Sequence, residues 1–337
     1  MGSSDFISNF VLGVIAFSLG AYFTMGNLRT AGKSVIWVSV LEAGFAWITV
    51  TMIMIIYSIW RHISIHPAFV LGAAASATAP AATVMIMREY RASGPVTNML
   101  LRVVAIDDAW CLVFSALAIT VANALAVGSF TLVVLFDAIF EIFGALLLGG
   151  VLGLGFYVLA RFINTTEEVL IITVGFILLA VGLSMKLRLS PLLTNIAFGL
   201  IIANIVNEGE LFFETLRNFD MVFFLGFFVL VGANLELHLI PRVGIMGFLY
   251  IIFRVIGKFI GVKLGAWVSK ADPNIGKYLA WGLVPQAGVA LGVALSAKAL
   301  YPVYGEMIFT TIAATTIIYE LLGPLCTKYG LQKAGEI

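Results

Sequence analysis

Two adjacent aspartates, Asp107 and Asp108, lie in the middle of the apolar run VVAIDDAWCLV. A charged side chain at the centre of a membrane helix costs roughly 2.5–3.5 kcal/mol on insertion scales, and such residues usually mark ion pathways. Adjacent helical residues point about 100° apart, so the two carboxylates can face different partners. One can pair with a cation on another helix, while the other holds either a proton or a dehydrated monovalent cation. The pair therefore predicts cation/proton exchange.

Lys258 is the expected partner of one of these aspartates. It lies in an apolar segment, and its compact ammonium suits a buried pair. The alternative is that both aspartates form static salt bridges, with Lys258 and Arg254, and bind no ion.

Two prolines interrupt apolar segments among small residues: Pro80 in SATAPAATV and Pro285 in GLVPQAGVA. Proline removes a backbone donor and clashes with the preceding turn. A broken helix at membrane depth is tolerated beside protein or a water-filled cavity, and its freed backbone groups can line an ion site. We therefore expect two broken helices near the aspartates, with Thr78 and Gln286 close to the breaks. A simple proline kink is the alternative.

The whole chain has the composition of a polytopic membrane protein. It has 337 residues, of which 61% are hydrophobic and 11% are charged, and its mean hydropathy is +1.09. A soluble domain has about 25% charged residues. Eleven apolar segments are long enough to cross a ~30 Å hydrocarbon core as helices, at 6–25, 34–60, 66–87, 97–125, 131–161, 168–185, 189–206, 218–236, 242–268, 277–299 and 305–327. This predicts a single all-α transmembrane domain over 1–337, neither an enzyme nor a nucleic-acid-binding protein, with no cofactor.

Two parts of the chain repeat the same order of features. Residues 17–47 align with 229–259, since each has an apolar helix, a glycine, a polar loop and a second helix, and the two proline motifs align further on. The loop charges give the two copies opposite orientations, and inverted repeats are typical of secondary transporters. Glu42 and Arg254 occupy equivalent positions, so we expect them to form a structural ion pair.

The basic residues of the loops predict the orientation. Twelve lysines and arginines lie in one set of loops, and five lie in the other set. By the positive-inside rule, the C-terminus is then cytoplasmic, and an odd number of helices puts the N-terminus outside. The expected location is a prokaryotic inner membrane, with the lipid bilayer as a partner.

Several motifs resemble those of the monovalent cation:proton antiporter superfamily, in its electrogenic sodium/proton branch. AIDD (105–108) resembles the paired-aspartate motif of that branch, and RVIGK (254–258) resembles its lysine motif. ATAP and VPQAGVALG resemble its two broken-helix signatures. The resemblance covers nearly the whole chain and implies a sodium/proton antiporter-like fold with inverted repeats and two crossed broken helices.

The resemblance also implies roles for individual residues. Asp108 is the carboxylate that carries the Na⁺ or the proton, and Asp107 assists it in binding Na⁺. Asp107 also forms a salt bridge with Lys258 that breaks and re-forms, and Thr78 completes the ion shell.

The same resemblance implies how the helices are divided. The core bundle, which carries the ion, comprises about 34–125 and 242–327. The scaffold or dimer bundle comprises about 6–25 and 168–236, with 131–161 as a linker helix. The core moves like an elevator against the scaffold of a homodimer. The family usually has two more helices at the N-terminus, so the expectation is a truncated chain or a smaller scaffold.

The expected function is secondary-active exchange of Na⁺ or Li⁺ for protons in pH homeostasis, with more than one proton per cation. A K⁺/H⁺ antiporter of the same fold is the alternative within the superfamily. A sodium-coupled organic anion symporter and an inactive truncated paralogue are the alternatives from other classes.

Overall fold

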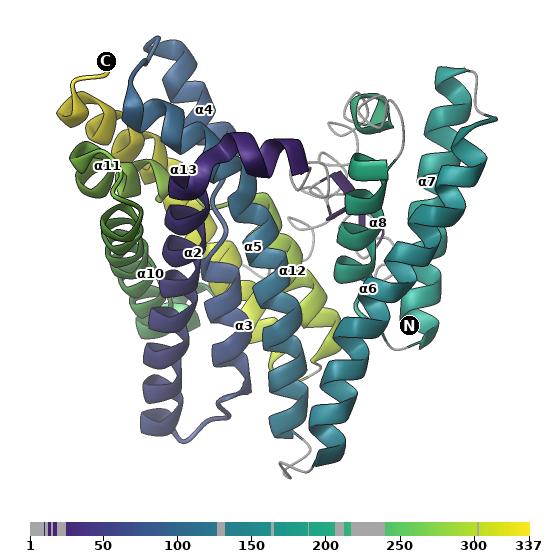
Figure 1. Cartoon of the computed structure of the whole chain (residues 1–337). Coiled ribbons are helices and arrows are strands. Elements are labelled where there is room, and N and C mark those ends of the chain that lie inside the picture. The colour runs from purple at the N-terminus through teal and green to yellow at the C-terminus, as the bar shows by residue number, and fades with distance from the viewer. Residues whose placement is uncertain are drawn as a thin grey trace. The chain divides into compact units, whose positions relative to one another are not determined.

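The computed structural model describes residues 10, 13–14, 16–18, 25–126, 132–162, 165–187, 189–205, 212–216, 240–301 and 303–337 (Figure 1). Within these residues, every regular element is a helix and no strand occurs. Five of the described helices are long and apolar enough to cross a membrane, and one bent pair could form a sixth span. The predicted class, an all-α polytopic membrane protein, is confirmed.

Nine of the eleven predicted segments correspond to described helices. The bounds differ from the prediction by at most nine residues, at the start of α2, and two segments are each divided by a break. Of segment 6–25, the structure describes only a few residues, which are helical, and segment 218–236 lies outside the described residues.

The chain divides into two compact units. The first comprises Met1–Thr30 and Asn123–Asn234, and the second comprises Ala31–Ala122 and Leu235–Ile337. The described helices of the first unit are α6 (Leu132–Ala160), α7 (Thr166–Leu187) and α8 (Pro191–Ile205). The second unit contains α3 (His66–Ala75), α4 (Pro80–Glu89), α11 (Pro273–Tyr278), the 3₁₀ helix η3 (Leu279–Leu283), α12 (Gly288–Leu300) and α13 (Gly305–Ala334). It also contains most of α2 (Met25–Arg61) and α5 (Pro95–Ala126), and all of α10 (Ile240–Ser269).

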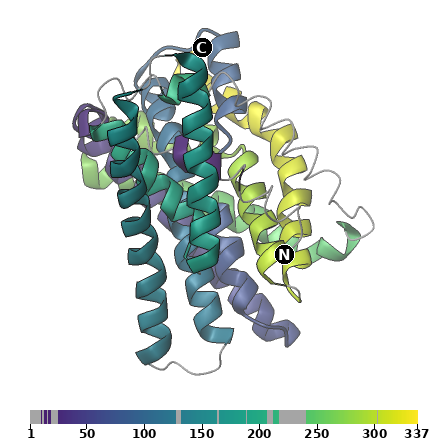
Figure 2. The same ribbon diagram turned by 90° about the vertical axis from the view of Figure 1, so that its right-hand side faces the viewer.

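In the first unit, α6 and α8 pack closely because α6 presents glycines to its neighbour (Figure 2). A Cβ atom at Gly149 would lie 2.2 Å from the carbonyl oxygen of Thr194, and one at Gly153 would lie 2.6 Å from Ile201. Small residues four apart allow this approach in membrane helices. The ring of Phe156 packs against Phe198, with centroids 5.5 Å apart. The segment predicted as a linker helix thus packs along α8 within this unit.

In the second unit, α2 and α10 run side by side (Figure 1). A Cβ atom at Gly257 would lie 2.7 Å from the carbonyl oxygen of Phe45, and one at Gly261 would lie 2.4 Å from the Cα of Glu42. Glycine is therefore needed where the two backbones touch, and this contact fixes the position of Glu42 relative to α10.

Both of these helices contain a glycine with a positive φ near the start. The φ angle is 75° at Gly32 and 30° at Gly244, and each glycine breaks the helical dihedrals of its element. Glycine tolerates this conformation because it has no Cβ atom. The two glycines occupy equivalent positions in the aligned segments 17–47 and 229–259.

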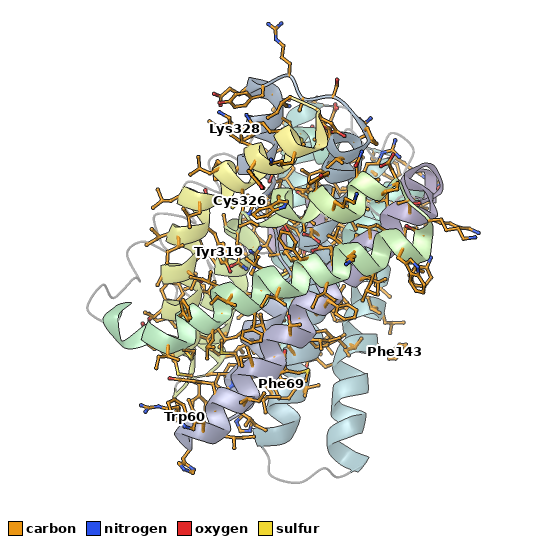
Figure 3. All side chains as sticks on the ribbon, turned by 90° about the vertical axis from the view of Figure 1, so that its left-hand side faces the viewer. Trp60, Phe69, Phe143, Tyr319, Cys326 and Lys328 are labelled. Carbon is orange, nitrogen blue, oxygen red and sulfur yellow. The ribbon has the colours of Figure 1, made fainter. Side chains whose placement is uncertain are left out.

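The outer surfaces of the helices are apolar, as lipid contact requires. Trp60 is 63% exposed and Phe143 is 67% exposed, and both side chains project from the ribbon in Figure 3. The polar side chains Glu42, Asp107, Arg254 and Lys258 are instead at most 1% exposed. Burial of four charged side chains points to a site inside the second unit.

Candidate ion site at the crossing of two broken helices

Two helices of the second unit are broken. Residues 76–79 separate α3 from α4, and residues 284–287 separate η3 from α12. The second break bends the chain by 53°. Pro80 is the first residue of α4, where its missing N–H is not needed, and Ala79 before it is extended. Pro285 lies within the second break. Both prolines therefore lie at true breaks in the helices, so neither forms a simple kink.

The two breaks touch each other. The backbone N–H of Ala79 donates to the carbonyl of Pro285 at 3.0 Å. The amide of Gln286 donates to the carbonyl of Ala74 at 2.7 Å, and the hydroxyl of Thr83 donates to that of Gly282 at 2.9 Å. These bonds satisfy backbone carbonyls that the breaks leave without a helical partner.

Arg254 on α10 donates hydrogen bonds to further backbone carbonyls at the two breaks. Its guanidinium donates to the carbonyls of Ala75 at 2.9 Å, Ala77 at 2.6 Å and Val284 at 2.7 Å. It also lies 4.4 Å from the centroid of the Tyr319 ring. The carbonyl of Ala75 ends α3, and those of Ala77 and Val284 lie one or two residues beyond the C-terminal ends of α3 and η3. Helix dipoles favour a positive charge at such ends. A guanidinium has five N–H donors, so it can bond to both breaks at once.

The predicted ion pair between Glu42 and Arg254 is therefore wrong. The guanidinium of Arg254 bonds to main-chain carbonyls. Glu42 instead contacts Lys258, which lies one turn after Arg254 on α10. The two cations lie four residues apart, so they share one face of the helix and both approach the same region. The guanidinium of Arg254 has more N–H donors than the ammonium of Lys258, so it is the group that bonds to the carbonyls at the breaks.

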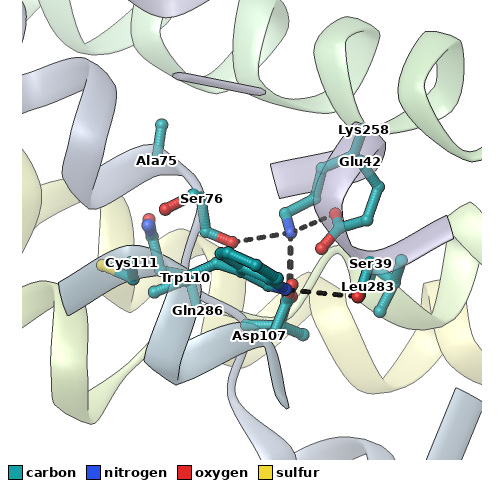
Figure 4. Close-up of polar contacts among 12 residues, drawn as sticks. Ser39, Glu42, Ala75, Ser76, Asp107, Trp110, Cys111, Lys258, Leu283 and Gln286 are labelled. Carbon is teal, nitrogen blue, oxygen red and sulfur yellow. Dashed lines mark hydrogen bonds and ion pairs between the residues drawn. The ribbon is translucent and has the colours of Figure 1, made fainter. Parts of the chain in front are cut away.

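Nζ of Lys258 lies within a shell of four oxygen atoms. Figure 4 marks its contacts with Glu42, Ser76 and Asp107. Its Nζ is 2.7 Å from Oε2 of Glu42, 2.8 Å from Oγ1 of Thr78, 2.9 Å from the carbonyl of Ser76 and 3.2 Å from Oδ2 of Asp107. The hydroxyl of Thr78 donates to Oδ2 of Asp107. Four elements, α2, α5, α10 and the first break, thus meet at one ammonium.

This cluster contains more carboxylates than cations. Glu42 and Asp107 share Lys258, while Arg254 is bonded to carbonyls. One oxygen of each carboxylate, Oε1 of Glu42 and Oδ1 of Asp107, is buried and has no hydrogen-bond partner among the residues that the structure describes. Buried acceptors without partners are costly, so the cluster has room for a further proton or cation.

Asp108 differs from Asp107 in its exposure and in its contacts. It is partly exposed, and it makes no hydrogen bond or ion pair with any residue that the structure describes. Cys111, one turn further on, is buried and directs its thiol to the carbonyl of Ala73 at 3.4 Å. Asp108 is thus a carboxylate beside a buried charge cluster, with its own oxygens available to a proton or a cation.

Sequence reasoning missed several contacts of this site. The indole of Trp110 donates to the hydroxyl of Ser39 at 3.2 Å, which links α5 to α2. Tyr319 and the carbonyl of Ser76 also had no assigned role, although Ser76 lies in the SATAP motif. Only the packing of the helices brings these groups to the cluster.

Broken helices that meet at buried charges are a feature of secondary transporters. Residues 2–331 match the family model described as "Sodium/hydrogen exchanger, transmembrane". The chain therefore belongs to the sodium/hydrogen exchanger family, within the monovalent cation:proton antiporter superfamily. It is an integral membrane cation/proton antiporter, and its relatives are transporters.

Two known proteins illustrate the relationship. The ammonium/H(+) antiporter subunit AmhT of Alkalihalophilus pseudofirmus is 24% identical over 315 residues, which cover 90% of this chain and 73% of AmhT. A structure of the sodium proton antiporter MjNhaP1 of Methanocaldococcus jannaschii at pH 8 has a TM-score of 0.72 and 19% identity, over 97% of this chain and 83% of that chain. A second structure of MjNhaP1 has a TM-score of 0.64. These matches confirm the antiporter fold.

Proposed function

We propose that the protein exchanges Na⁺ or Li⁺ for protons, with Asp108 carrying the cation and the proton in turn. The observation that carries the proposal is the contrast between the two aspartates. Asp107 is held by Lys258 and Thr78, whereas Asp108 has no hydrogen-bond or ion-pair partner among the described residues and is partly exposed. A carboxylate in that position binds a proton or a cation, and the two exclude each other.

Asp107 and Thr78 complete the proposed shell of the cation. Asp107 lies beside Asp108, and one of its oxygens is buried with no hydrogen-bond partner in the described part of the chain. When the cation binds, Asp107 turns from Lys258 toward it and the salt bridge breaks. Lys258 keeps the carboxylate of Glu42, so its charge is not left unpaired. Proton binding to Asp108 restores the bridge.

The two compact units support an elevator-type mechanism. The second unit contains every residue of the ion site, so it serves as the core bundle that carries the ion. The first unit then serves as the scaffold and dimer bundle of a homodimer. The positively charged loops support a cytoplasmic C-terminus and an external N-terminus in a prokaryotic inner membrane. The glycine breaks at Gly32 and Gly244 support the inverted repeat.

The test is current measurement on a solid-supported membrane with the purified protein in liposomes. Steps of Na⁺, Li⁺ and K⁺ are applied at several pH values, with Asp108→Asn as the inactive control. A Na⁺-evoked current that is bell-shaped in pH and absent in the variant is the expected result. Wild-type-like, pH-dependent exchange in Asp108→Asn would rule out its role as the carrier.

Further variants separate the charge-coupling roles. Asp107→Asn and Lys258→Ala are expected to weaken exchange or change the charge moved per cation, because each removes one side of the breakable bridge. Ion-driven pH changes in liposomes, with the membrane potential clamped and unclamped, measure that charge. An unchanged dependence on potential in both variants would contradict the proposed bridge.

Ammonium is the second candidate for the transported cation. The relative AmhT is named as a subunit of an ammonium/H(+) antiporter. In addition, the shell around Nζ of Lys258 has four oxygens at 2.7–3.2 Å, although a lysine ammonium has only three protons. A nearby ammonium ion would find similar acceptors in Asp107 and Thr78. Competition among ammonium, K⁺ and Na⁺ in the same assay identifies the cation.

A further inference from the structure

A pocket of about 760 Å³ lies where α10 ends and α11 begins. It is lined by residues between 263 and 277, and none of them belongs to the ion site. Its lining includes three lysines, Lys263, Lys270 and Lys277, and no acidic residue. The pocket is therefore both positively charged and largely apolar.

The end of α10 and the residue that follows it form one wall of the pocket. Lys263 and Trp267 are four residues apart near the end of α10, so they lie on one face of that helix. Lys270 follows Ser269, the last residue of α10, and has a positive φ of 55°. Lys277 comes from α11 on the opposite side. The two helices meet closely at the base, where a Cβ atom at Gly276 would lie 3.3 Å from that of Ala266.

The surroundings of the three lysines leave their charges open to an anion. None of them makes a hydrogen bond or an ion pair with a residue that the structure describes, and all three are exposed. The nearby Asp272 instead caps α11 by accepting from the N–H of Asn274 at 2.8 Å. Three unpaired cations around one pocket repel one another, so an anion bound among them would be stabilised.

The pocket lies at one face of the membrane. The span Gly244–Ser269 has 26 residues, which is roughly 39 Å as a helix and exceeds the ~30 Å hydrocarbon core. Its C-terminal end, with Trp267 77% exposed, therefore lies at headgroup depth. Tryptophan is enriched there, and lysine side chains from deeper positions extend toward the headgroups.

We propose that this pocket binds an anionic phospholipid. The phosphate of the headgroup lies among Lys263, Lys270 and Lys277, and an acyl chain lies along Trp267 and Ala266. Basic pockets between membrane helices are suited to such headgroups. A small soluble anion would not use the exposed indole, whereas a lipid uses both the charge and the apolar wall. The lipid would hold the end of the helix that carries Lys258.

The test is native mass spectrometry of the purified full-length protein in detergent, with phosphatidylglycerol, cardiolipin or phosphatidylcholine added. The triple variant Lys263→Gln, Lys270→Gln and Lys277→Gln removes the charges, and Trp267→Ala removes the apolar wall. The matched control removes three exposed or partly exposed cations elsewhere in the second unit, through Arg88→Gln, Lys328→Gln and Lys333→Gln. Glycerol phosphate tests the headgroup chemistry without acyl chains.

We expect one or two anionic lipids to bind per chain, and phosphatidylcholine to bind much more weakly. The triple variant should bind anionic lipid about a hundredfold more weakly, since each lysine near a membrane surface contributes about 1 kcal/mol, and Trp267→Ala should also weaken binding. The control should change affinity by less than threefold. Unchanged binding in the triple variant, or an equal loss in the control, would overturn the site. Glycerol phosphate binding as strongly as the lipid would overturn the lipid assignment.

Discussion

Nζ of Lys258 lies 2.7 Å from Oε2 of Glu42, and both side chains are buried. The distance from the same nitrogen to Asp107 is 3.2 Å. Glu42 and Lys258 lie on helices whose backbones touch at Gly257 and Gly261, whereas Asp107 lies on a third helix. The glutamate is therefore the fixed partner of the lysine, and the aspartate is the partner that can be exchanged.

Glu42→Gln should lower the stability of the protein, and it should do so more when residue 258 is a lysine than when it is a methionine. Removing one partner of a buried ion pair costs up to about 3–5 kcal/mol when the other charge is left alone. The cost should be smaller here, because Asp107 still pairs with Lys258. The glutamine keeps the shape of the side chain, so the melting temperature in detergent mainly reports the lost charge. The loss should be clearly smaller when Lys258 is already methionine, because interacting residues are not additive.

The matched comparison combines Glu42→Gln with Arg254→Lys. We expect these two effects to be closer to additive, since Arg254 bonds to carbonyls and not to Glu42. A stronger coupling of Glu42 to Arg254 than to Lys258 would contradict the observed pairing.

Arg254→Lys should impair both exchange and folding, although it keeps the charge. A lysine has three donors at one point and cannot reach the carbonyls of Ala77 and Val284 together, as the guanidinium does. We expect cation exchange to fall at least about tenfold, and the melting temperature to fall as well. Arg61→Lys, at the exposed end of α2, is the control and should leave both unchanged. Normal exchange in Arg254→Lys would show that bonding to both breaks is not required.

Gly261→Ala should destabilise the contact between α2 and α10. The added methyl group would lie 2.4 Å from the backbone of Leu41 and Glu42, which cannot move away as a side chain can. Overpacking of this kind costs about 1–3 kcal/mol. Gly182→Ala in α7 is the matched control, because no described atom outside the local backbone of α7 lies within 4 Å of its added methyl. Thermal unfolding in detergent compares the two, and equal stability would argue against the close helix contact.

Glu336 should stabilise the start of α5, the helix that carries both aspartates. Its carboxylate accepts hydrogen bonds from the N–H groups of Val96 and Thr97, both at 2.7 Å, and from the Thr97 hydroxyl at 2.6 Å. Loss of a cap costs about 0.5–2 kcal/mol. Glu336→Ala should therefore lower the melting temperature, and Glu336→Gln should do so less. Glu89→Ala, at an exposed glutamate, should have no effect. If both alanine variants melted alike, Glu336 would not act as a cap.

Much of the site could be predicted from the local sequence. The hydropathy pattern predicts the membrane helices, because crossing the bilayer requires long apolar runs. Pro80 and Pro285 predict the two breaks, because proline cannot continue a helix without losing a hydrogen bond. Asp107 and Asp108 stand out because charges in apolar runs are costly. Each of these signals depends on a residue and its neighbours in the chain.

The partners of the charged residues depended on the tertiary structure. Arg254 and Lys258 lie one turn apart on the same face of α10, so the sequence allowed either to pair with Glu42. The choice was made by the carbonyls at the two breaks, which come from residues far apart in the chain and are bonded by Arg254. The cap formed by Glu336 on α5 likewise joins residues about 240 positions apart. Composition and periodicity determine which segments form helices, but the rotation and crossing of those helices determine which side chains meet.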